Sequence, residues 1–171
     1  MPVISVKRAM ISRIALAFAL GLAPALGLAG QSVRVIDGDT LHWQGQRIRL
    51  SGIDAPETGQ TCRDSTGRRW ACGQESKLAL KRMIDDRGAK GRLRCEVEGA
   101  DRYGRQVATC YIGPRSINRA QVLEGHAWDW PKYSKGTYRD AEQRARASRR
   151  GIWADPDPVP PWQWRHRSGG R

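Results

Sequence analysis

Residues 36–57 read IDGDTLHWQGQRIRLSGIDAPE, and this stretch decides the first half of the fold. Apolar and polar residues alternate on both sides of Gly45-Gln46, which predicts two strands joined by a tight turn. The apolar residues expected to face each other are Leu41, Trp43, Ile48 and Leu50. Four acids gather at the two ends of this hairpin: Asp37, Asp39, Asp54 and Glu57. Asp-Gly pairs ordinarily mark solvated turns, so only the rest of the chain gives these acids a chemical meaning.

A second hairpin is predicted from GRLRCEVEG (91–99) and RQVATCYIG (105–113), with residues 101–104 as its loop. One register gathers the apolar residues of both strands on a shared face. In that register the opposed pairs are Leu93 with Ile112, Cys95 with Cys110, and Val97 with Ala108. A Cys95–Cys110 disulfide is therefore favoured, which leaves Cys62 to pair with Cys72. A zinc site is disfavoured because the chain has no C-x-x-C pair and its three histidines are dispersed.

Three helices are predicted after the first hairpin. Apolar spacing indicates one near 74–87, Ser116 caps a second that ends near Leu123, and the capping-box pattern at 137–140 begins a third that ends before Gly151. Short strands interrupted by a helix and followed by two more predict an α+β protein. The expected fold is a five-stranded OB-fold Greek-key β-barrel with three packed α-helices.

The two ends of the chain are expected to lie outside this domain. Residues 1–29 combine basic residues, a short apolar run and a small-residue cleavage pattern, which is typical of a secretory signal peptide. An uncleaved membrane anchor is the alternative. The domain then covers 31–154, and the Pro-, Trp- and Arg-rich tail at 155–171 is expected to be extended. Export and disulfides agree with a secreted or periplasmic protein that has no stable membrane span after cleavage.

The charge of the chain indicates a polyanionic partner. Removing Lys7, Arg8 and Arg13 from the formal net charge of +13 leaves +10 on the mature chain. Such a field attracts nucleic acid, and it attracts anionic membranes and cell-wall polymers by the same physics. Charge alone does not choose among them, and nothing in the pattern indicates an obligate protein partner or more than a monomer.

Three motifs in order, IDGDT (36–40), RIRLSGIDAPE (47–57) and DRYGR (101–105), carry a family resemblance. From about Val33 to Trp153 the chain resembles the staphylococcal-nuclease-like (thermonuclease) family, which implies the OB barrel and a Ca²⁺-dependent phosphodiesterase acting on DNA and RNA. The resemblance implies metal ligands at Asp39, Asp54 and the carbonyl of Ala55, a general base at Glu57, and phosphate-binding arginines at Arg49 and Arg105. Ala55 stands where the best-known member has threonine, and alanine offers the same carbonyl.

These residue types suit the implied reaction. Calcium takes six to eight oxygen ligands, so two carboxylates and a carbonyl leave positions for water and a phosphate oxygen. An arginine fork pairs with two phosphate oxygens at once. Simple alternation, however, places Arg49 on the face opposite Asp39, so convergence requires a bend, for which Gly52 is the expected site.

Several aromatic residues keep two interpretations. Tyr103 and Tyr133 correspond to positions near the family's nucleotide pocket, or they are packing residues. Trp128 and Trp130 either stack on bases or close the core beneath the third helix. For the whole protein the alternatives to a nuclease are a non-catalytic OB-fold nucleic-acid-binding protein of the cell envelope and a non-enzymatic envelope-binding protein.

Overall fold

The computed structural model describes residues 33–86 and 93–167, all within one compact unit that spans residues 31–171. The expected signal peptide at 1–29 lies outside the described residues. Among the helices of the two described ranges, none has the length and apolar character to cross a membrane.

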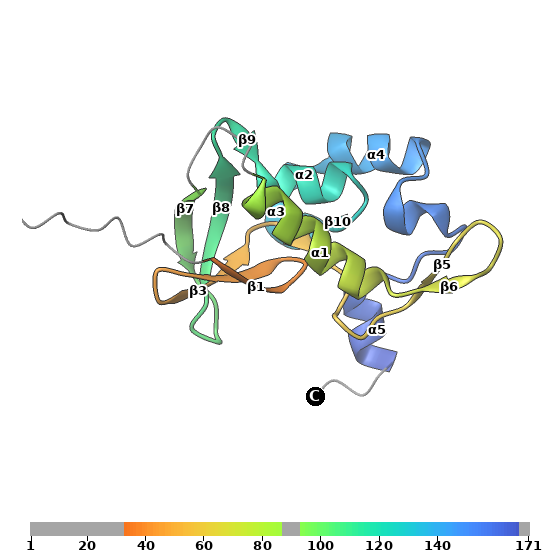
Figure 1. The fold of residues 1–171 in the computed structure, drawn as a ribbon, viewed down its shortest axis with the longest axis horizontal. Coiled ribbons are helices and arrows are strands. Elements are labelled where there is room, and N and C mark those ends of the chain that lie inside the picture. The colour runs from red at the N-terminus through yellow and green to blue at the C-terminus, as the bar shows by residue number, and fades with distance from the viewer. Residues whose placement is uncertain (1–32, 87–92, 168–171) are drawn as a thin grey trace, which may run out of the picture. The chain divides into compact units, whose positions relative to one another are not determined.

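A three-stranded meander begins the fold (Figure 1). It consists of β1 (Arg34–Asp37), β2 (Thr40–Trp43) and β3 (Gln46–Leu50), paired antiparallel. The β2–β3 turn is centred on Gln44 (φ 51°) and Gly45 (φ 76°), one residue earlier than predicted. Two positive φ values in a two-residue loop match the right-handed twist of the flanking strands, and this preference sets the turn position.

The predicted register of the second hairpin is confirmed. It consists of β7 (Leu93–Ala100) and β8 (Gln106–Ile112), and Cys95 lies opposite Cys110 and forms a disulfide with it. A register shift between Val97 and Gly99 twists the outer part of β7. Val97 is consequently more than half exposed, although its pattern placed it on the buried face.

The strand order is β1-β2-β3-β8-β7, with β3 and β8 parallel and β9 (Arg115–Ser116) added to β8. A meander followed by a hairpin that returns parallel to its third strand is the connectivity expected of an OB-type barrel. The predicted α+β fold class is therefore confirmed.

Three helices correspond to the predicted ones: the first two pack on the sheet, and the third packs on the second (Figure 1). They are α1 (Cys72–Asp85), α2 (Ile117–Leu123) and α4 (Arg139–Ala147), close to the three predicted ranges. Ser116 caps α2 as expected by accepting a hydrogen bond from the amide of Arg119. The predicted capping box of α4 is wrong, because Tyr138 is the N-cap and the hydroxyl of Thr137 donates to the carbonyl of Ser134.

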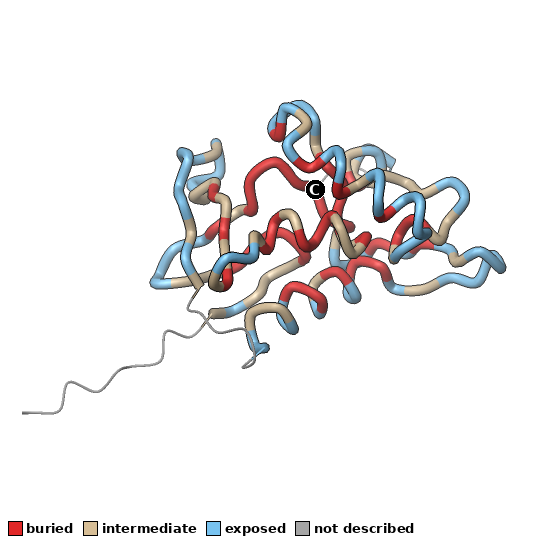
Figure 2. Tube along the Cα trace, turned by 90° about the horizontal axis from the view of Figure 1, so that it is seen from above, coloured by how far each residue is buried: buried red, intermediate tan, exposed pale blue. Residues whose placement is uncertain are grey.

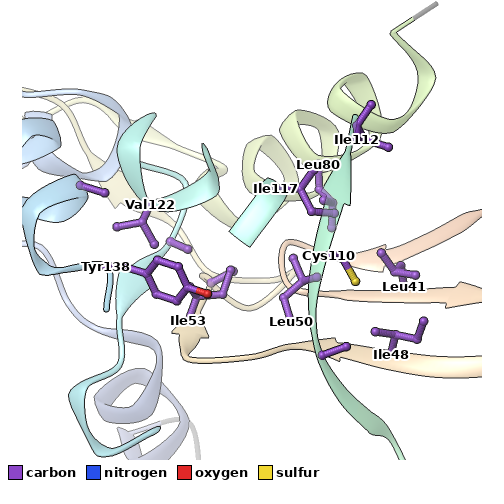
Figure 3. Close-up of a cluster of buried hydrophobic side chains, with 14 residues drawn as sticks. Leu41, Ile48, Leu50, Ile53, Leu80, Cys110, Ile112, Ile117, Val122 and Tyr138 are labelled. Carbon is purple, nitrogen blue, oxygen red and sulfur yellow. The ribbon is translucent and has the colours of Figure 1, made fainter. Parts of the chain in front are cut away.

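The barrel and the helices share one core. Buried residues run through the middle of the unit (Figure 2), and side chains from β2, β3, β8, α1 and α2 meet there (Figure 3). The largest of these fully buried apolar side chains are Leu41, Ile48, Leu50, Leu80, Ile117 and Val122. Burial of each contributes about 1.5–3 kcal/mol to stability.

A second, smaller cluster lies around the Cys62–Cys72 disulfide. The disulfide ties the hairpin of β5 (Cys62–Arg63) and β6 (Arg69–Trp70) to the first residue of α1. Trp128, in the short strand β10 (Trp128–Asp129), meets the edge of Trp153 at 5.3 Å between ring centroids. Trp153 belongs to the 3₁₀ helix η1 (Gly151–Ala154). Trp128 is thus a core residue, the second of its two predicted roles.

The C-terminal segment differs from its prediction. Instead of a wholly extended tail, residues 161–167 form the helix α5 (Pro161–Arg167). Pro161 occupies the first helical position, where a missing amide hydrogen costs nothing. The helix begins at this proline and carries Trp162 and Arg165 back toward the domain.

Candidate active site

Two buried aspartates form the centre of the site. Asp39 follows Gly38 in the turn between β1 and β2, and Asp54 ends the two-residue strand β4 (Ile53–Asp54), which pairs with β10. Asp39 is 2 % exposed and Asp54 is 0 % exposed. The amide of Ala55 donates to Asp39 Oδ2 at 2.8 Å, which joins the two loops directly. A buried carboxylate needs charge partners, and arginines supply them here.

Arg49 lies between the two aspartates. Its Nη1 is paired with Asp39 Oδ1, and its Nη2 donates to Asp54 Oδ1 at 2.7 Å. The chain bends sharply at Gly52 (φ 71°), immediately after β3, and this bend brings Asp54 back to Arg49. The expected convergence of Asp39, Arg49 and Asp54 is therefore present. The bend at Gly52 accounts only for Asp54, whereas Asp39 lies in the turn before β2 and so stands outside the alternation of that strand.

Burial and charge shift the pKa values of this group in opposite directions. Burial raises the pKa of Asp39 to about 6, although the Arg49 cation partly offsets the effect. Burial also raises the pKa of Asp54, against the hydrogen bond from Arg165 and the charge of Arg49. Burial disfavours the Arg49 cation, but Asp39 and Asp54 together hold its pKa above the ordinary value.

Close packing fixes the Asp39 turn against the helices. A Cβ at Gly38 would lie 1.9 Å from Ser76 Oγ of α1 and 2.7 Å from the Cβ of Ala55, so only glycine fits. The Gly38 carbonyl accepts a 2.6 Å hydrogen bond from Gln121 Nε2 of α2. The motif IDGDT thus combines a glycine required by packing, Gly38, with the buried carboxylate of Asp39.

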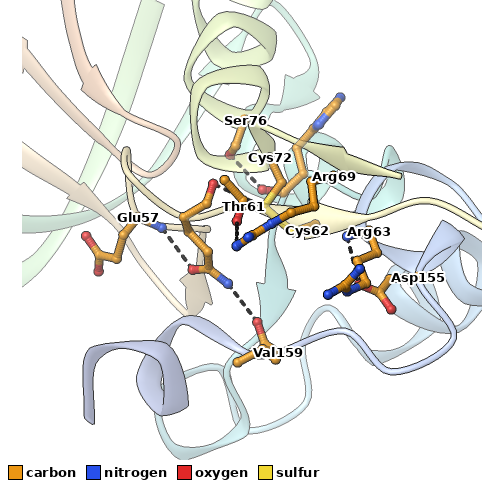
Figure 4. The surroundings of a disulfide bond; sticks show 11 residues. Glu57, Thr61, Cys62, Arg63, Arg69, Cys72, Ser76, Asp155 and Val159 are labelled. Carbon is orange, nitrogen blue, oxygen red and sulfur yellow. Dashed lines mark hydrogen bonds between the residues drawn. A yellow bond between two sulfur atoms is a disulfide. The ribbon is translucent and has the colours of Figure 1, made fainter. Parts of the chain in front are cut away.

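Glu57 lies at the rim of the same site, with its side chain 35 % exposed. Its loop is held by Gln60, whose Oε1 accepts from the Glu57 amide at 3.2 Å and whose amide donates to the Glu57 carbonyl at 2.7 Å (Figure 4). Gln60 itself is buried, and its Nε2 donates to the carbonyl of Val159 at 2.8 Å. The sequence did not single out Gln60, because one glutamine in a polar loop carries no periodic signal.

Gly73→Ala is expected to destabilise the protein by about 1–3 kcal/mol through a clash under this loop. An added Cβ at Gly73 would lie 1.8 Å from the Glu57 carbonyl oxygen. A glycine-to-alanine change at a helix position without a clash would instead stabilise the protein by about 1 kcal/mol. The sign of the change in unfolding free energy therefore distinguishes the clash from helix propensity. Gly59→Ala is the matched control, since a Cβ there meets nothing within 4 Å. Urea unfolding of both variants measures the difference, and equal stability of the two would show that the loop yields freely.

Arg165 of α5 is the member of the site that sequence reasoning missed. Its Nη2 donates to Asp54 Oδ2 at 2.8 Å, and its Nη1 donates to Asp54 Oδ1 at 3.2 Å and to Glu57 Oε1 at 2.7 Å. The spacing of Trp162 and Arg165, three residues apart on one helical face, was a signal that could have indicated a docked helix. Composition alone favoured an extended tail.

Arg105 and Tyr103 are not drawn into this cluster. Arg105 Nε donates to Asp101 Oδ2 at 2.7 Å within the β7–β8 loop, and Tyr103 is 65 % exposed beside it. The guanidinium of Arg105 lies 5.5 Å from the Tyr103 ring centroid. The strand β8, which follows the β7–β8 loop, pairs with β3 and places Val107 beside Arg49. The loop that carries Arg105 therefore leads into the strand next to Arg49.

An aromatic group borders the arginines. Trp130 lies 6.0 Å from the Arg49 guanidinium and 5.9 Å from that of Arg165, measured to the ring centroid. Tyr133, in α3 (Pro131–Ser134), meets the edge of Trp130 at 4.4 Å. Tyr133 therefore reaches the site through Trp130. Trp128 pairs with Asp54 between β10 and β4, but its side chain packs in the second core cluster.

The donor set suits a hard divalent cation. Asp39 and Asp54 share one guanidinium and supply only oxygen atoms, the ligand type that calcium prefers. In residues 33–86 and 93–167, no cluster of three or more histidines, cysteines or acids has the geometry of a complete metal site. Any cation held here would therefore complete its shell with backbone carbonyl, water or phosphate oxygens.

Comparison with known proteins identifies the family. A family described as staphylococcal nuclease homologue matches residues 47–155. The succinoglycan biosynthesis protein ExoI of Rhizobium meliloti is 40 % identical over 131 residues, which cover 76 % of this chain and 65 % of that protein. Protein ParB of Escherichia coli is 34 % identical (92 % and 90 % covered), and an uncharacterized endonuclease of Haemophilus influenzae is 35 % identical (79 % and 71 %). The chain belongs to the family of staphylococcal nuclease homologues.

Proposed function

We propose that this protein is a secreted, calcium-dependent nuclease that hydrolyses phosphodiester bonds of DNA and RNA with little sequence preference. The observation that carries the proposal is the meeting of Asp39 and Asp54 on Arg49 in a buried site, with Glu57 joined to Asp54 through Arg165 at its rim. The relative from Haemophilus influenzae is named an endonuclease, which supports the same reaction class.

In the proposed mechanism, Asp39, Asp54 and the carbonyl of Ala55 would hold calcium. Bound there, the ion would supply a positive charge that draws in a phosphate group and withdraws electron density from it. Asp39 is oriented for this role by the Ala55 amide and the Thr40 hydroxyl, which both donate to it. Ordering of the carboxylates before substrate arrives lowers the cost of binding.

Glu57 is the proposed general base. It lies at the solvent-facing rim, where its carboxylate can accept a proton from a water molecule that attacks the phosphorus atom. Pro56 and the hydrogen bonds of Gln60 restrict the loop that carries it. Removal of the proton makes the water a stronger nucleophile as the new phosphorus–oxygen bond forms and the ester bond breaks.

Arg49 and Arg105 are the proposed phosphate-binding residues. Arg49 already lies between the metal-ligand candidates, and its side chain is 14 % exposed. Charge that builds on the phosphate oxygens in the transition state is stabilised by paired N–H donors in a site with little water. Arg105 would exchange its contact with Asp101 for one with substrate, and Tyr103 and Tyr133 are proposed to line the nucleotide-binding surface.

The expected result with the purified chain from residue 31 is degradation of both plasmid DNA and bulk RNA in calcium. The charge of +10 attracts either backbone, and no contact described above reads a base edge. Binding measured with calcium chelated should weaken by about 10³-fold or more between roughly 50 and 200 mM salt.

A gel shift with intact products in calcium would instead support the non-catalytic OB-fold binding protein. Binding that does not change with salt would contradict recognition of the phosphate backbone. Degradation of RNA alone would restrict the proposal to one substrate class.

A further inference from the structure

Arg165 occupies the oxygen atoms that a metal ion would need. Asp54 Oδ2 accepts from Arg165 Nη2, and Asp54 Oδ1 accepts from both Arg165 Nη1 and Arg49 Nη2. Glu57 Oε1 also accepts from Arg165 Nη1. Both oxygens of Asp54 are thus engaged by arginine, so a cation that approaches Asp54 competes with a guanidinium group for these oxygens.

The helix that carries Arg165 is docked by contacts outside the acidic cluster. Trp162 stacks on Trp130 with an interplanar angle of 9° and 6.2 Å between ring centroids. Just before the helix, the Val159 carbonyl accepts the 2.8 Å hydrogen bond from Gln60 (Figure 4). These anchors hold α5 over the site, so the position of Arg165 is set by the fold and not by its charge alone.

Arg165 is more easily displaced than Arg49. The Arg165 side chain is 35 % exposed and belongs to a seven-residue helix near the end of the chain. The Arg49 side chain is 14 % exposed and comes from β3 in the sheet. Moving Arg165 leaves the barrel intact. Moving Arg49 would instead break its ion pairs with the two buried carboxylates, Asp39 and Asp54.

We propose that Arg165 is a tethered competitor of calcium, and that α5 sets the calcium concentration at which the site becomes loaded. The inference rests on the proposed calcium site. Asp39, Asp54 and Glu57 carry three negative charges against two from Arg49 and Arg165. A divalent ion that replaces Arg165 adds positive charge to a partly buried cluster, while the released α5 exposes Glu57 to water and substrate.

Arg165→Gln is expected to lower the calcium dissociation constant by about tenfold, as measured by isothermal titration without substrate. Arg167→Gln removes the same charge from an exposed position in the same helix and should leave the constant within about twofold of wild type. Trp162→Ala, which loosens α5 and keeps Arg165, should shift the constant in the same direction as Arg165→Gln. Circular dichroism and thermal unfolding confirm that each variant is folded.

Hydrogen exchange of the wild-type chain provides a second readout. Amides of residues 162–167 should exchange faster in calcium than in chelator, because the displaced helix loses its protection. Equal calcium affinities for wild type and Arg165→Gln, or unchanged exchange of α5 on calcium binding, would overturn the inference and leave the proposed nuclease intact. Failure of every variant to bind calcium would overturn the proposed metal site itself.

Discussion

Glu57→Gln is expected to lower the turnover number by roughly 10²–10⁴-fold, the usual contribution of a general base. Glutamine has nearly the same size and cannot accept the proton from the attacking water. The proposed calcium ligands Asp39 and Asp54 remain, so calcium binding should be retained. Substrate affinity should stay similar or increase, because a negative charge near the phosphate is gone. The measurements are turnover on a fluorescent oligonucleotide, calcium titration, and substrate binding in chelator.

Glu124→Gln provides the charge-matched control, because Glu124 lies beyond α2 and is paired at the surface with Arg150. Its turnover should equal that of wild type. If Glu57→Gln retains near wild-type turnover, Glu57 is not the base. It is then better assigned as a residue that orients the loop and holds Arg165.

Arg49→Lys is expected to reduce turnover by roughly 10²–10³-fold even though the charge is preserved. The two ends of the guanidinium contact Asp39 and Asp54, and Nη2 lies 3.4 Å from the Ile53 carbonyl. One ammonium group cannot span both aspartates or donate two parallel hydrogen bonds to a phosphate. Steady-state kinetics and the free energy of unfolding should be measured together, because the same contacts stabilise the fold.

Arg47→Lys, an exposed change two residues earlier in β3, controls for conservative substitution on this strand. Turnover of Arg49→Lys equal to that of Arg47→Lys would mean that charge alone is required at position 49, and the paired-donor role would be wrong.

The two hairpins, β2–β3 and β7–β8, were predictable because local sequence patterns and long-range packing agree there. Alternation fixed the register that joins Cys95 to Cys110, and turn residues located the β2–β3 hairpin to within one position. The exposed position of Val97 was not predictable, because the register shift beside it depends on the twist of the sheet. The helix α5 was not predictable either, since tertiary contacts of Trp162 hold a segment whose composition favours an extended chain.

The site residues that lie in short sequence motifs were predictable. The residue that reaches the site only through the tertiary fold was not. Asp39, Arg49 and Asp54 meet as the family resemblance implied. Gly52 provides the bend that returns Asp54, and Asp39 reaches Arg49 because it lies in a turn outside the alternation of β2. Arg165 approaches from 111 residues further along the chain. No spacing rule links such distant positions, so only the fold reveals this contact.

Calcium-dependent cleavage of nucleic acid can be tested directly by a plasmid-cleavage time course that is interrupted with a chelator. The chain from residue 31 is given plasmid DNA and calcium, a chelator is added at half conversion, and excess calcium is added later. Cleavage should stop when the chelator is added and resume when calcium is restored, and Asp54→Ala should show almost no cleavage throughout. Cleavage that continues at an unchanged rate in chelator would contradict the account.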